Sequence, residues 1–366
     1  MTATAIILAA GHGTRMKSTR PKPLHVMCGR PMVLHVIHAL EHLQPQCTMV
    51  VVGHGADRVS DVVRLASPEW ANVDFTTQAR QRGTGDAAMV GLAALDERDG
   101  LSHADVDDES TVIVMPGDTP LLRADTIARL VQEHESSANA ATLLTAELSE
   151  PYGYGRVVRG KDGSVVRVVE ERDATPAERA LHEVNTSIYA FKRGLLGPAL
   201  RRIKNNNAQS EYYLTDVVEV LTSVGHRVGA TLGDAIEVTG VNDRWQLALA
   251  ERELRARTNR ALLLAGVTML DPRQTFIDVT VQIGKDVTLY PGTILQGTTV
   301  IGDGCVVGPA TRLVNTEVGA NSRVEQTTAR DSLIGDDCEV GPYAFLPEGT
   351  KVESGAKTGA FYDGSQ

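Results

Sequence analysis

Short apolar runs alternate with amphipathic stretches over the first two thirds of the chain. The apolar runs have the length of buried strands, and several stretches between them repeat their apolar residues at the spacing of a helix. We expect strands at Ile6–Ala9, Thr48–Val52, Val73–Gln78, Thr111–Met115, Ala141–Thr145 and Thr186–Phe191, and helices at Met32–Leu43, Asp86–Leu95 and Ala124–His134. This alternation predicts an α/β domain with a mostly parallel sheet over residues 1–241.

The next stretch, residues 242–265, has the composition of a single helix. It holds many helix-forming residues, contains no internal Gly or Pro, and stops before Gly266. Such a stretch favours an uninterrupted helix with a glycine at its end. We therefore expect a connecting helix from about Asp243 to Ala265.

In residues 266–366 the pattern changes to an apolar residue at every sixth position. The first series is Ile277, Ile283, Leu289, Leu295, Ile301, Val307 and Leu313, and the second is Ile334, Val340, Leu346 and Val352. A period of six is typical of hexapeptide repeats in a parallel β-helix, because helices repeat at 3.6 residues and alternating strands at 2. Short strands of a β-sandwich are the alternative. The register break near Asn315–Arg330 predicts an inserted loop.

Composition narrows the class of protein. The 366 residues are 42% hydrophobic and 22% charged, as in ordinary globular proteins. No run approaches the length of a membrane span, and Ala5–Ala10 is too short for a secretory signal. The net charge of −10 argues against general nucleic-acid binding, so an anionic ligand would need a local basic site. Four cysteines without a CxxC pair fit reduced thiols in a cytoplasm.

A basic site of this kind follows the first predicted strand. The stretch AIILAAGHGTRMKSTRPKPLH turns from apolar residues to glycines and then presents, without an acidic residue, Arg15, Lys17, Arg20 and Lys22. Gly11 and Gly13 would expose main-chain N–H groups and let a phosphate approach. Arg15 can clamp phosphate oxygens with two hydrogen bonds, and Lys22 can act as a mobile charge.

Other phosphate-binding motifs fit this stretch poorly. GHGTRM has Met16 at the third glycine of GxGxxG, and no Asp or Glu closes the second predicted strand, which disfavours a dinucleotide-binding dehydrogenase. A GK[ST] sequence is lacking, which disfavours a Walker-type loop. A solvated turn with surface lysines and arginines is the remaining alternative.

Several segments together resemble one enzyme family. LAAGHGTRMKSTRPKPL resembles the signature of sugar-1-phosphate nucleotidyltransferases. The segments QARQRGTGDA, PGDTPLL, YGYGRVVR, VVEERDAT, EVNTSIYAF, NNAQSEYYLTD and GVNDR then follow in the order found in N-acetylglucosamine-1-phosphate uridylyltransferases. That family is usually fused to a glucosamine-1-phosphate acetyltransferase. The resemblance covers nearly the whole chain and implies a Rossmann-like nucleotidyltransferase domain, a linker helix and a left-handed parallel β-helix.

The resemblance also implies an activity. It is transfer of a uridylyl group from UTP to N-acetylglucosamine 1-phosphate, with release of pyrophosphate, to make UDP-N-acetylglucosamine for peptidoglycan and the cell wall. It further implies Mg²⁺ as cofactor, a cytoplasmic enzyme, and a homotrimer assembled through the β-helix.

Catalytic and metal-binding positions follow from the same resemblance. Arg15 and Lys22 match the positions that hold the triphosphate, and Asp118 and Asn242 match the ligands of Mg²⁺. Asp118 follows the apolar run TVIVM, and the carboxyl end of such a strand is where α/β sheets bind ligands. The structural alternatives are a turn-forming role for Asp118 and a helix N-cap at Asn242.

Substrate contacts fall into three groups under this resemblance. The first lies at the glycine turn and beside Asp118, and comprises Leu8, Ala9, Ala10, Gly11, Gly13 and Gly117. The second reads uracil and comprises Gln78, Gly83 and Thr84. An amide that both donates and accepts hydrogen bonds suits this base. The third contacts the sugar and its N-acetyl group and comprises Gly155, Glu170, Asn185 and Thr186. Tyr212, Tyr213 and Thr215 are assigned no direct chemistry.

The chain departs from the family pattern at two places near this site. Asp86 stands where the family usually has His, and Pro116 stands at a position that is often aromatic or polar. Both changes leave the phosphate and metal positions intact and put the fine sugar specificity in doubt. In the repeats, Pro347 falls where the family has a phosphate-binding Arg, and the sequence stops before the corresponding Lys. We therefore expect a truncated acetyltransferase domain without acetyl transfer.

Two other functions compete with the uridylyltransferase. One is another sugar-1-phosphate nucleotidyltransferase with a β-helix, making ADP-glucose, dTDP-glucose or GDP-mannose. The other is a non-catalytic scaffold that binds sugar nucleotides. EVNTSIYAF, NNAQSEYYLTD and GVND favour the uridylyltransferase over the first, and the intact basic and metal-binding positions argue against the second.

Overall fold

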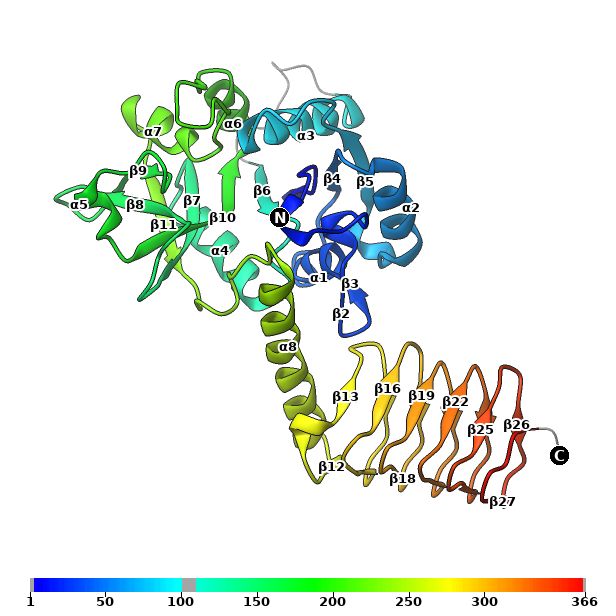
Figure 1. Cartoon of the computed structure of the whole chain (residues 1–366). Coiled ribbons are helices and arrows are strands. Elements are labelled where there is room, and N and C mark those ends of the chain that lie inside the picture. Colours follow the sequence, from blue (N-terminus) through cyan, green and yellow to red (C-terminus); the bar gives the residue numbers. More distant parts are fainter. Residues whose placement is uncertain (1–2, 101–109, 365–366) are drawn as a thin grey trace. The chain divides into compact units, whose positions relative to one another are not determined.

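The computed structural model describes residues 3–100 and 110–364 (Figure 1). The chain divides into two compact units. The first comprises Met1–His25 and Pro31–Gln246, and the second comprises Val26–Arg30 and Leu247–Gln366.

The described part of the first unit is built on a nine-stranded sheet. Its strands are β1 (Ala3–Leu8), β4 (Thr48–Val52), β5 (Val73–Thr77), β6 (Thr111–Pro116), β7 (Ala141–Glu147), β8 (Gly155–Arg159), β9 (Val165–Val169), β10 (Glu183–Lys192) and β11 (Val228–Leu232). The order is β11-β7-β10-β6-β1-β4-β5, and β8 and β9 extend it from β10. Strands β6, β1, β4 and β5 are parallel, whereas β10 runs antiparallel to β6 and β7.

Helices cover both faces of this sheet (Figure 1). They are α1 (Met32–His38), α2 (Ala56–Ala66), α3 (Thr84–Arg98), α4 (Ala124–Ser136), α5 (Pro176–Arg179), α6 (Arg193–Leu200) and α7 (Asp216–Ser223). Ala5 and Ile7 of β1 pack in one hydrophobic cluster with α1, α2 and α4, and Ile6 packs in another with α3, α6 and α7. Because successive strand residues point to opposite faces, β1 is buried on both sides. The predicted α/β fold is confirmed.

All six predicted strands are present, but other elements differ from the prediction. Helix α1 ends at His38 rather than at the predicted Leu43. Beyond His38 the main chain makes tighter hydrogen bonds between residues three positions apart, such as the one that the Leu40 N–H donates to the Ile37 carbonyl. Strands β8, β9 and β11 and helices α2, α5 and α6 were not predicted from the sequence.

Helix α8 (Arg244–Leu264) begins and ends within one residue of the predicted connecting helix. The Asp243 carboxylate accepts a hydrogen bond from the Gln246 N–H at 2.8 Å and so caps the first turn. The suggestion that Asn242 is the N-cap is therefore wrong. In the part of the chain that the structure describes, no helix has the length and apolar character needed to span a membrane.

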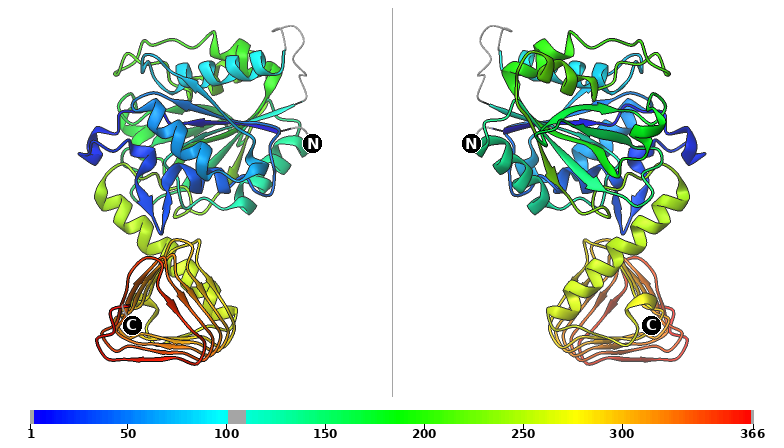
Figure 2. Two further views of the ribbon diagram at one scale, coloured as in Figure 1. Left: turned by 90° about the vertical axis from the view of Figure 1, so that its right-hand side faces the viewer. Right: turned by 90° about the vertical axis from the view of Figure 1, so that its left-hand side faces the viewer.

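The second unit is a left-handed parallel β-helix. Figure 2 shows its coils as a triangle with one sheet on each side. The first sheet contains β12 (Thr268–Met269), β15 (Thr288–Leu289), β18 (Val306–Val307), β21 (Arg323–Val324), β24 (Glu339–Val340) and β27 (Lys357–Gly359). The second contains β13 (Phe276–Ile277), β16 (Ile294–Gln296), β19 (Arg312–Val314), β22 (Thr328–Arg330) and β25 (Phe345–Leu346). The third contains β14 (Gln282–Ile283), β17 (Val300–Ile301), β20 (Glu317–Val318), β23 (Leu333–Ile334) and β26 (Lys351–Val352). Residues of the predicted period, such as Leu295 and Leu346, fill its core.

The register break has a different cause from the one predicted. The structure has no inserted loop at Asn315–Arg330: β19, β20 and the following strands stay paired in sequence. Instead, some corners are one residue shorter, so the buried Leu313 and Val318 are five positions apart rather than six. Asn315 makes one such corner with a positive φ of 49°.

Candidate functional site

The carboxyl ends of β1 and β6 bring two segments of the predicted site together. Leu8 pairs with Pro116 in the parallel register, and the Gly117 N–H donates to the Leu8 carbonyl at 2.9 Å. The glycine turn and Asp118 therefore leave the sheet at the same edge. The Val241 N–H donates to the Asp118 carbonyl at 2.8 Å, which places Asn242 beside them.

Four predicted residues meet at this edge. The Lys22 ammonium forms an ion pair with the Asp118 carboxylate and donates to Asn242 Oδ1 at 3.0 Å. Arg15 Nη2 donates to the same Asn242 oxygen at 2.9 Å. The predicted catalytic residues and the predicted metal ligands thus share one hydrogen-bonded cluster, with the Arg15 side chain exposed.

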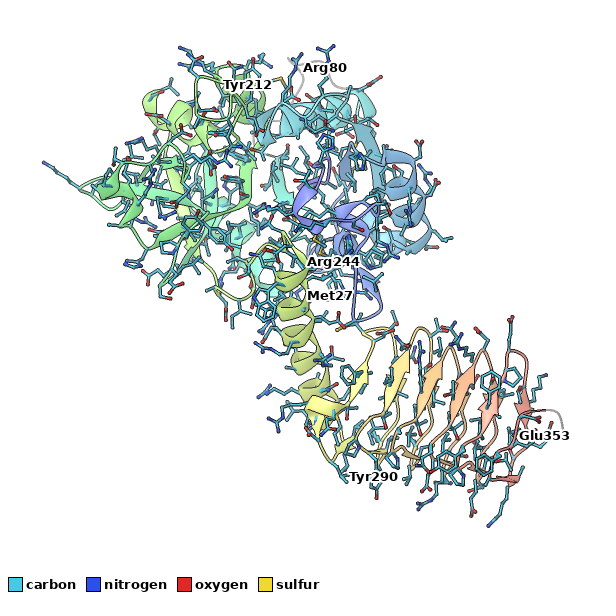
Figure 3. The ribbon with its side chains drawn as sticks, in the orientation of Figure 1. Met27, Arg80, Tyr212, Arg244, Tyr290 and Glu353 are labelled. Carbon is cyan, nitrogen blue, oxygen red and sulfur yellow. The ribbon has the colours of Figure 1, made fainter. Side chains whose placement is uncertain are left out.

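The glycine turn is shaped to let Lys22 reach this cluster. Gly13 has a φ of 60°, and a Cβ on it would lie 2.6 Å from Lys22 Cβ, so only glycine fits. A Cβ on Gly11 would meet nothing within 4 Å, which leaves that side of the turn open. Arg244, labelled in Figure 3, donates from Nε to the Met16 carbonyl at 3.1 Å and fixes the far end of the turn.

The cluster has the donor atoms of a magnesium site. Asp118 Oδ2 and Asn242 Oδ1 both accept from the single Lys22 ammonium, so they converge on one point where positive charge is stabilised. Carboxylate and amide oxygens are ligands that Mg²⁺ takes, with phosphate oxygens and water completing its shell. The residues present therefore fit Mg²⁺. The described residues contain no group of three or more His, Cys, Asp or Glu that could hold a metal by themselves.

The predicted uracil-reading segment lies next to the glycine turn. Gln81 Nε2 donates to the Ala10 carbonyl at 3.4 Å, which links the two. Gln78 is buried, and its Nε2 donates to the Gly83 carbonyl at 3.2 Å. Gly83 has a φ of 113°, and a Cβ there would lie 2.5 Å from the Tyr212 carbonyl oxygen. The Thr84 hydroxyl accepts from the Leu214 N–H at 3.0 Å, so this side chain serves the fold.

The predicted sugar-contacting residues form a second cluster. Gly155 of β8 pairs with Asn185 of β10, and a Cβ on Gly155 would lie 3.5 Å from a Glu170 carboxylate oxygen. Asn185 Nδ2 donates to the Tyr189 hydroxyl at 2.7 Å, while its buried Oδ1 has no partner among the described residues. The Thr186 hydroxyl donates to the Leu144 carbonyl at 2.7 Å, so it is occupied within the fold.

Burial sets the protonation chemistry of this second cluster. It raises the pKa of the Glu170 carboxyl, while a hydrogen bond that the Thr215 hydroxyl donates at 3.1 Å opposes the shift. Burial also raises the pKa of Tyr154, whose hydrogen bonds to Gly240 and Thr239 reach back toward Asp118. From the sequence, Thr215 was assigned no direct chemistry and Tyr154 was not considered, although the quoted segments SEYYLTD and YGYGRVVR contain them.

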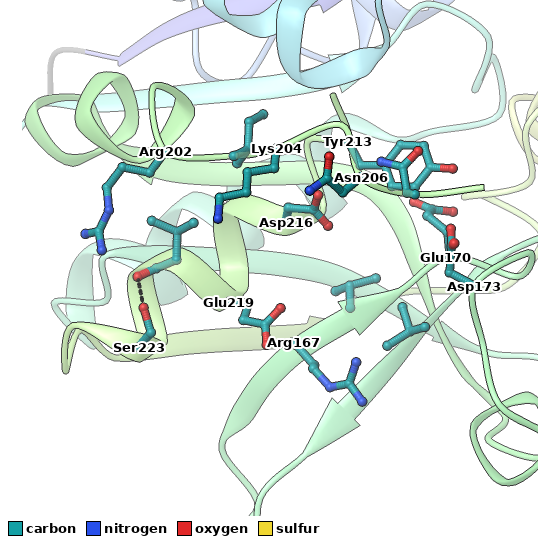
Figure 4. Close-up of a pocket in the computed structure, with 15 residues that line it drawn as sticks. Arg167, Glu170, Asp173, Arg202, Lys204, Asn206, Tyr213, Asp216, Glu219 and Ser223 are labelled. Atoms are coloured by element: carbon teal, nitrogen blue, oxygen red, sulfur yellow. Dashed lines mark hydrogen bonds between the residues drawn. The ribbon is translucent and has the colours of Figure 1, made fainter. Parts of the chain in front are cut away.

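A cavity of about 470 Å³ opens beside Glu170. Figure 4 shows Glu170 and Tyr213 at one end and Arg202 and Ser223 at the other. Of the predicted site residues, Glu170 is the one that lines it. The cavity is therefore distinct from the cluster around Lys22.

The model of the MobA-like NTP transferase domain family matches residues 5–202. This match and the fold define the chain as a nucleotidyltransferase. The chain is also 44% identical over 363 residues to the bifunctional protein GlmU of Streptomyces avermitilis, covering 99% of this chain and 73% of that protein. It is 45% identical over 360 residues to the bifunctional proteins GlmU of Mycobacterium marinum and Mycobacterium tuberculosis, covering 98% of this chain and 71% of each. The chain belongs to the GlmU family.

Proposed function

We propose that the chain transfers a uridylyl group from UTP to N-acetylglucosamine 1-phosphate, giving UDP-N-acetylglucosamine and pyrophosphate for cell-wall precursor synthesis. The observation that carries this proposal is the convergence of Arg15, Lys22, Asp118 and Asn242 at the carboxyl ends of β1 and β6. A sheet edge with two cations beside two oxygen ligands suits a triphosphate with its metal.

The reaction requires no covalent intermediate on the protein. A phosphate oxygen of the sugar attacks the α-phosphorus of UTP in line, the bond between the α-phosphorus and its bridging oxygen breaks, and the electron pair leaves with pyrophosphate. The protein has to hold two anions that repel each other. Arg15 and Lys22 would neutralise the triphosphate and the charge that develops on the leaving group.

Asp118 and Asn242 would hold Mg²⁺, which when bound supplies further positive charge to the phosphate oxygens. Lys22 contacts both residues and so orients them toward a common point. Gln78 and the main chain of Gly83 would read the uracil edge. Glu170 and Asn185 would bind the sugar, and the unpartnered buried Asn185 Oδ1 supports this role because such an atom is costly without a hydrogen-bond donor.

The second unit would serve assembly as a homotrimer, because its three flat sheets offer long surfaces for parallel packing. We place the protein in the cytoplasm, since all four cysteines are buried free thiols. Acetyl transfer by these 366 residues is not expected, because Pro347 replaces the phosphate-binding Arg of the repeats. Incubation with acetyl-CoA and glucosamine 1-phosphate should release no CoA above background, and clear release that depends on the protein would contradict this.

The deciding experiment is a pyrophosphate-release assay with UTP, N-acetylglucosamine 1-phosphate and Mg²⁺. Release that requires all three components is expected. A panel of ATP, dTTP and GTP with glucose 1-phosphate and mannose 1-phosphate tests the rival nucleotidyltransferases, and a higher kcat/KM for another pair would replace the proposed substrates. Absence of turnover with every pair would favour the scaffold.

A further inference from the structure

Gln78, at the end of β5, is held in one place by its main chain and its side chain. Its N–H donates to the Val52 carbonyl at 2.8 Å, and the residue is 4% exposed. Its Nε2 donates to Asp86 Oδ2 at 2.7 Å as well as to the Gly83 carbonyl. Both hydrogens of the amide nitrogen therefore have acceptors.

These two partners determine which way the amide faces. A main-chain carbonyl accepts only, and so does an ionised carboxylate, so neither can pair with the Gln78 oxygen. Turning the amide by 180° would set its oxygen against two acceptors and lose both hydrogen bonds. The Oε1 atom has no hydrogen bond to any described residue. It is the group of this side chain that is left for a ligand.

The Asp86 carboxylate is itself firmly placed. It lies in the first turn of α3, where the positive end of the helix dipole favours an acidic side chain. The start of that helix is fixed by the Gly85 N–H, which donates to the Tyr212 carbonyl at 2.8 Å. Main-chain hydrogen bonds therefore hold both ends of the segment from Gln78 to Asp86, so the Asp86 carboxylate has little freedom to move away from the Gln78 amide.

We propose that Asp86 is a positioning residue that makes Gln78 select uracil over cytosine. This inference rests on the proposed role of Gln78 in reading the base. With its nitrogen engaged, Gln78 presents only an acceptor. Uracil offers the ring N3–H donor to that acceptor, whereas cytosine has a bare lone pair at N3, which an acceptor repels.

The family residue at this position would act differently. A neutral histidine carries one donor and one acceptor nitrogen, so it can meet either end of an amide. An ionised carboxylate meets only the nitrogen end. The change to Asp86, which from the sequence alone puts sugar specificity in doubt, contacts Gln78, the proposed base-reading residue, and tightens base selection through it.

The test compares kcat/KM for UTP and for CTP with N-acetylglucosamine 1-phosphate and Mg²⁺. The proteins are the wild type, Asp86→Asn, Gln78→Ala and the double variant. The control is Glu97→Gln, which removes one charge from an exposed position of the same helix.

An asparagine can accept or donate, so in this variant only the longer contact to the Gly83 carbonyl, at 3.2 Å, opposes a turn of the Gln78 amide toward cytosine. We expect Asp86→Asn to lower the UTP-over-CTP preference about tenfold, since one directed hydrogen bond is at stake. The control should leave the preference unchanged.

The double variant separates positioning from a structural effect. If Asp86 acts through Gln78, adding Asp86→Asn to Gln78→Ala should not change the UTP-over-CTP ratio further. Equal losses with both nucleotides in Asp86→Asn, or a further change of the ratio in the double variant, would overturn the inference. If Asp86→Asn does not fold, the UTP-over-CTP preference is measured with Asp86→Ser instead. If CTP turns over too slowly, the preference is taken from the inhibition constants of UMP and CMP. Failure of the wild type to use UTP would instead contradict the proposed function.

Discussion

At the scale of single residues, one amide oxygen joins distant parts of the chain. Asn242 Oδ1 accepts from Lys22, 220 positions away, and from Arg15, 227 positions away. Charge-assisted hydrogen bonds of this kind are short and strong, so each partner restricts the others. A substitution at one of these residues should therefore alter the geometry of the rest as well as remove its own contact.

Arg15 is the residue expected to follow the leaving pyrophosphate. Arg15→Ala should lower kcat/KM by about 10² to 10³, as for loss of one charge-stabilising group. Arg15→Lys should recover little, because a point charge cannot replace two parallel hydrogen bonds. Steady-state kinetics check this, with Lys17→Ala as the matched control from the exposed part of the turn. Equal damage from Lys17→Ala would mean that the basic residues act as a diffuse field.

Asp118 is the residue expected to bind the metal most tightly. Asp118→Asn should keep the fold but raise the Mg²⁺ concentration needed for half-maximal activity and lower kcat, because a neutral oxygen replaces a charged ligand. Activity measured over a Mg²⁺ titration checks this. The exposed Asp57→Asn is the control. A variant with an unchanged titration curve would exclude Asp118 as a ligand.

The sequence alone indicates which polar residues belong to this site, but it does not show which residues their side chains contact. Arg15, Lys22, Asp118 and Asn242 are recognisable because motifs contain them, and the structure brings all four together. Thr84 and Thr186 match the motifs equally well, yet their hydroxyls bond to the main chain. Thr215 was assigned no direct chemistry, because its contact with Glu170 depends on the packing of segments 45 positions apart.

At the scale of elements, α4 buries an ionisable ring against the sheet. His134 is 2% exposed, and its Nδ1 lies 3.0 Å from the Thr142 hydroxyl of β7. Burial, with a smaller contribution from the charge of Lys192, lowers the pKa of His134 to about 4. The folded protein therefore holds the neutral ring at a pH where the unfolded chain binds a proton.

This burial predicts a loss of stability in acid. The unfolded state binds more protons between the unfolded pKa of 6.5 and the folded value of about 4, so the stability from neutral His134 falls as pH drops through that window. Relative to His134→Gln, the free energy of unfolding of the wild type should decrease by about 3 kcal/mol from pH 7.5 to pH 4. Denaturant unfolding at several pH values checks this. The exposed His226→Gln should follow the wild type, and a constant difference for His134→Gln would contradict the prediction.

Elements with a strong apolar period were predictable, and short or half-exposed ones were not. The central strands and α4 have continuous or helical apolar patterns that match their burial. Strand β9 alternates irregularly, with Val168 and Val169 both buried, so its pattern does not have the period of a strand. The antiparallel direction of β10 depends on chain topology, which local periodicity does not encode.

At the scale of the whole molecule, the second unit presents aromatic side chains on its surface. Phe276 and Phe345 are 40% and 49% exposed on the first and last strands of one sheet of the β-helix. The Arg255 guanidinium lies over the Phe276 ring, 4.3 Å from its centre. Apolar side chains so far apart do not form one patch, so the proposed homotrimer rests on the flat sheets themselves.

The homotrimer predicts a mass in solution of three times the 39.2 kDa of one chain. Light scattering after size-exclusion chromatography at micromolar concentration checks this, and the mass should stay constant over a tenfold dilution because an assembly through a long rigid face is expected to dissociate slowly. UTP should not change it. A mass of one or two chains would contradict the proposal.

The shortened corners of the β-helix bear on how such a chain can change its length. In an ordinary strand, deletion of one residue turns every later side chain to the opposite face. Here the corner between Leu313 and Val318 lacks a residue, and both side chains still point into the core. Each side of a coil resets the alternation, so natural gains and losses of single residues should accumulate at corners such as Asn315. Alignments of relatives should place their gaps there, and this unit should tolerate single-residue deletions at its corners that would inactivate a conventional sheet.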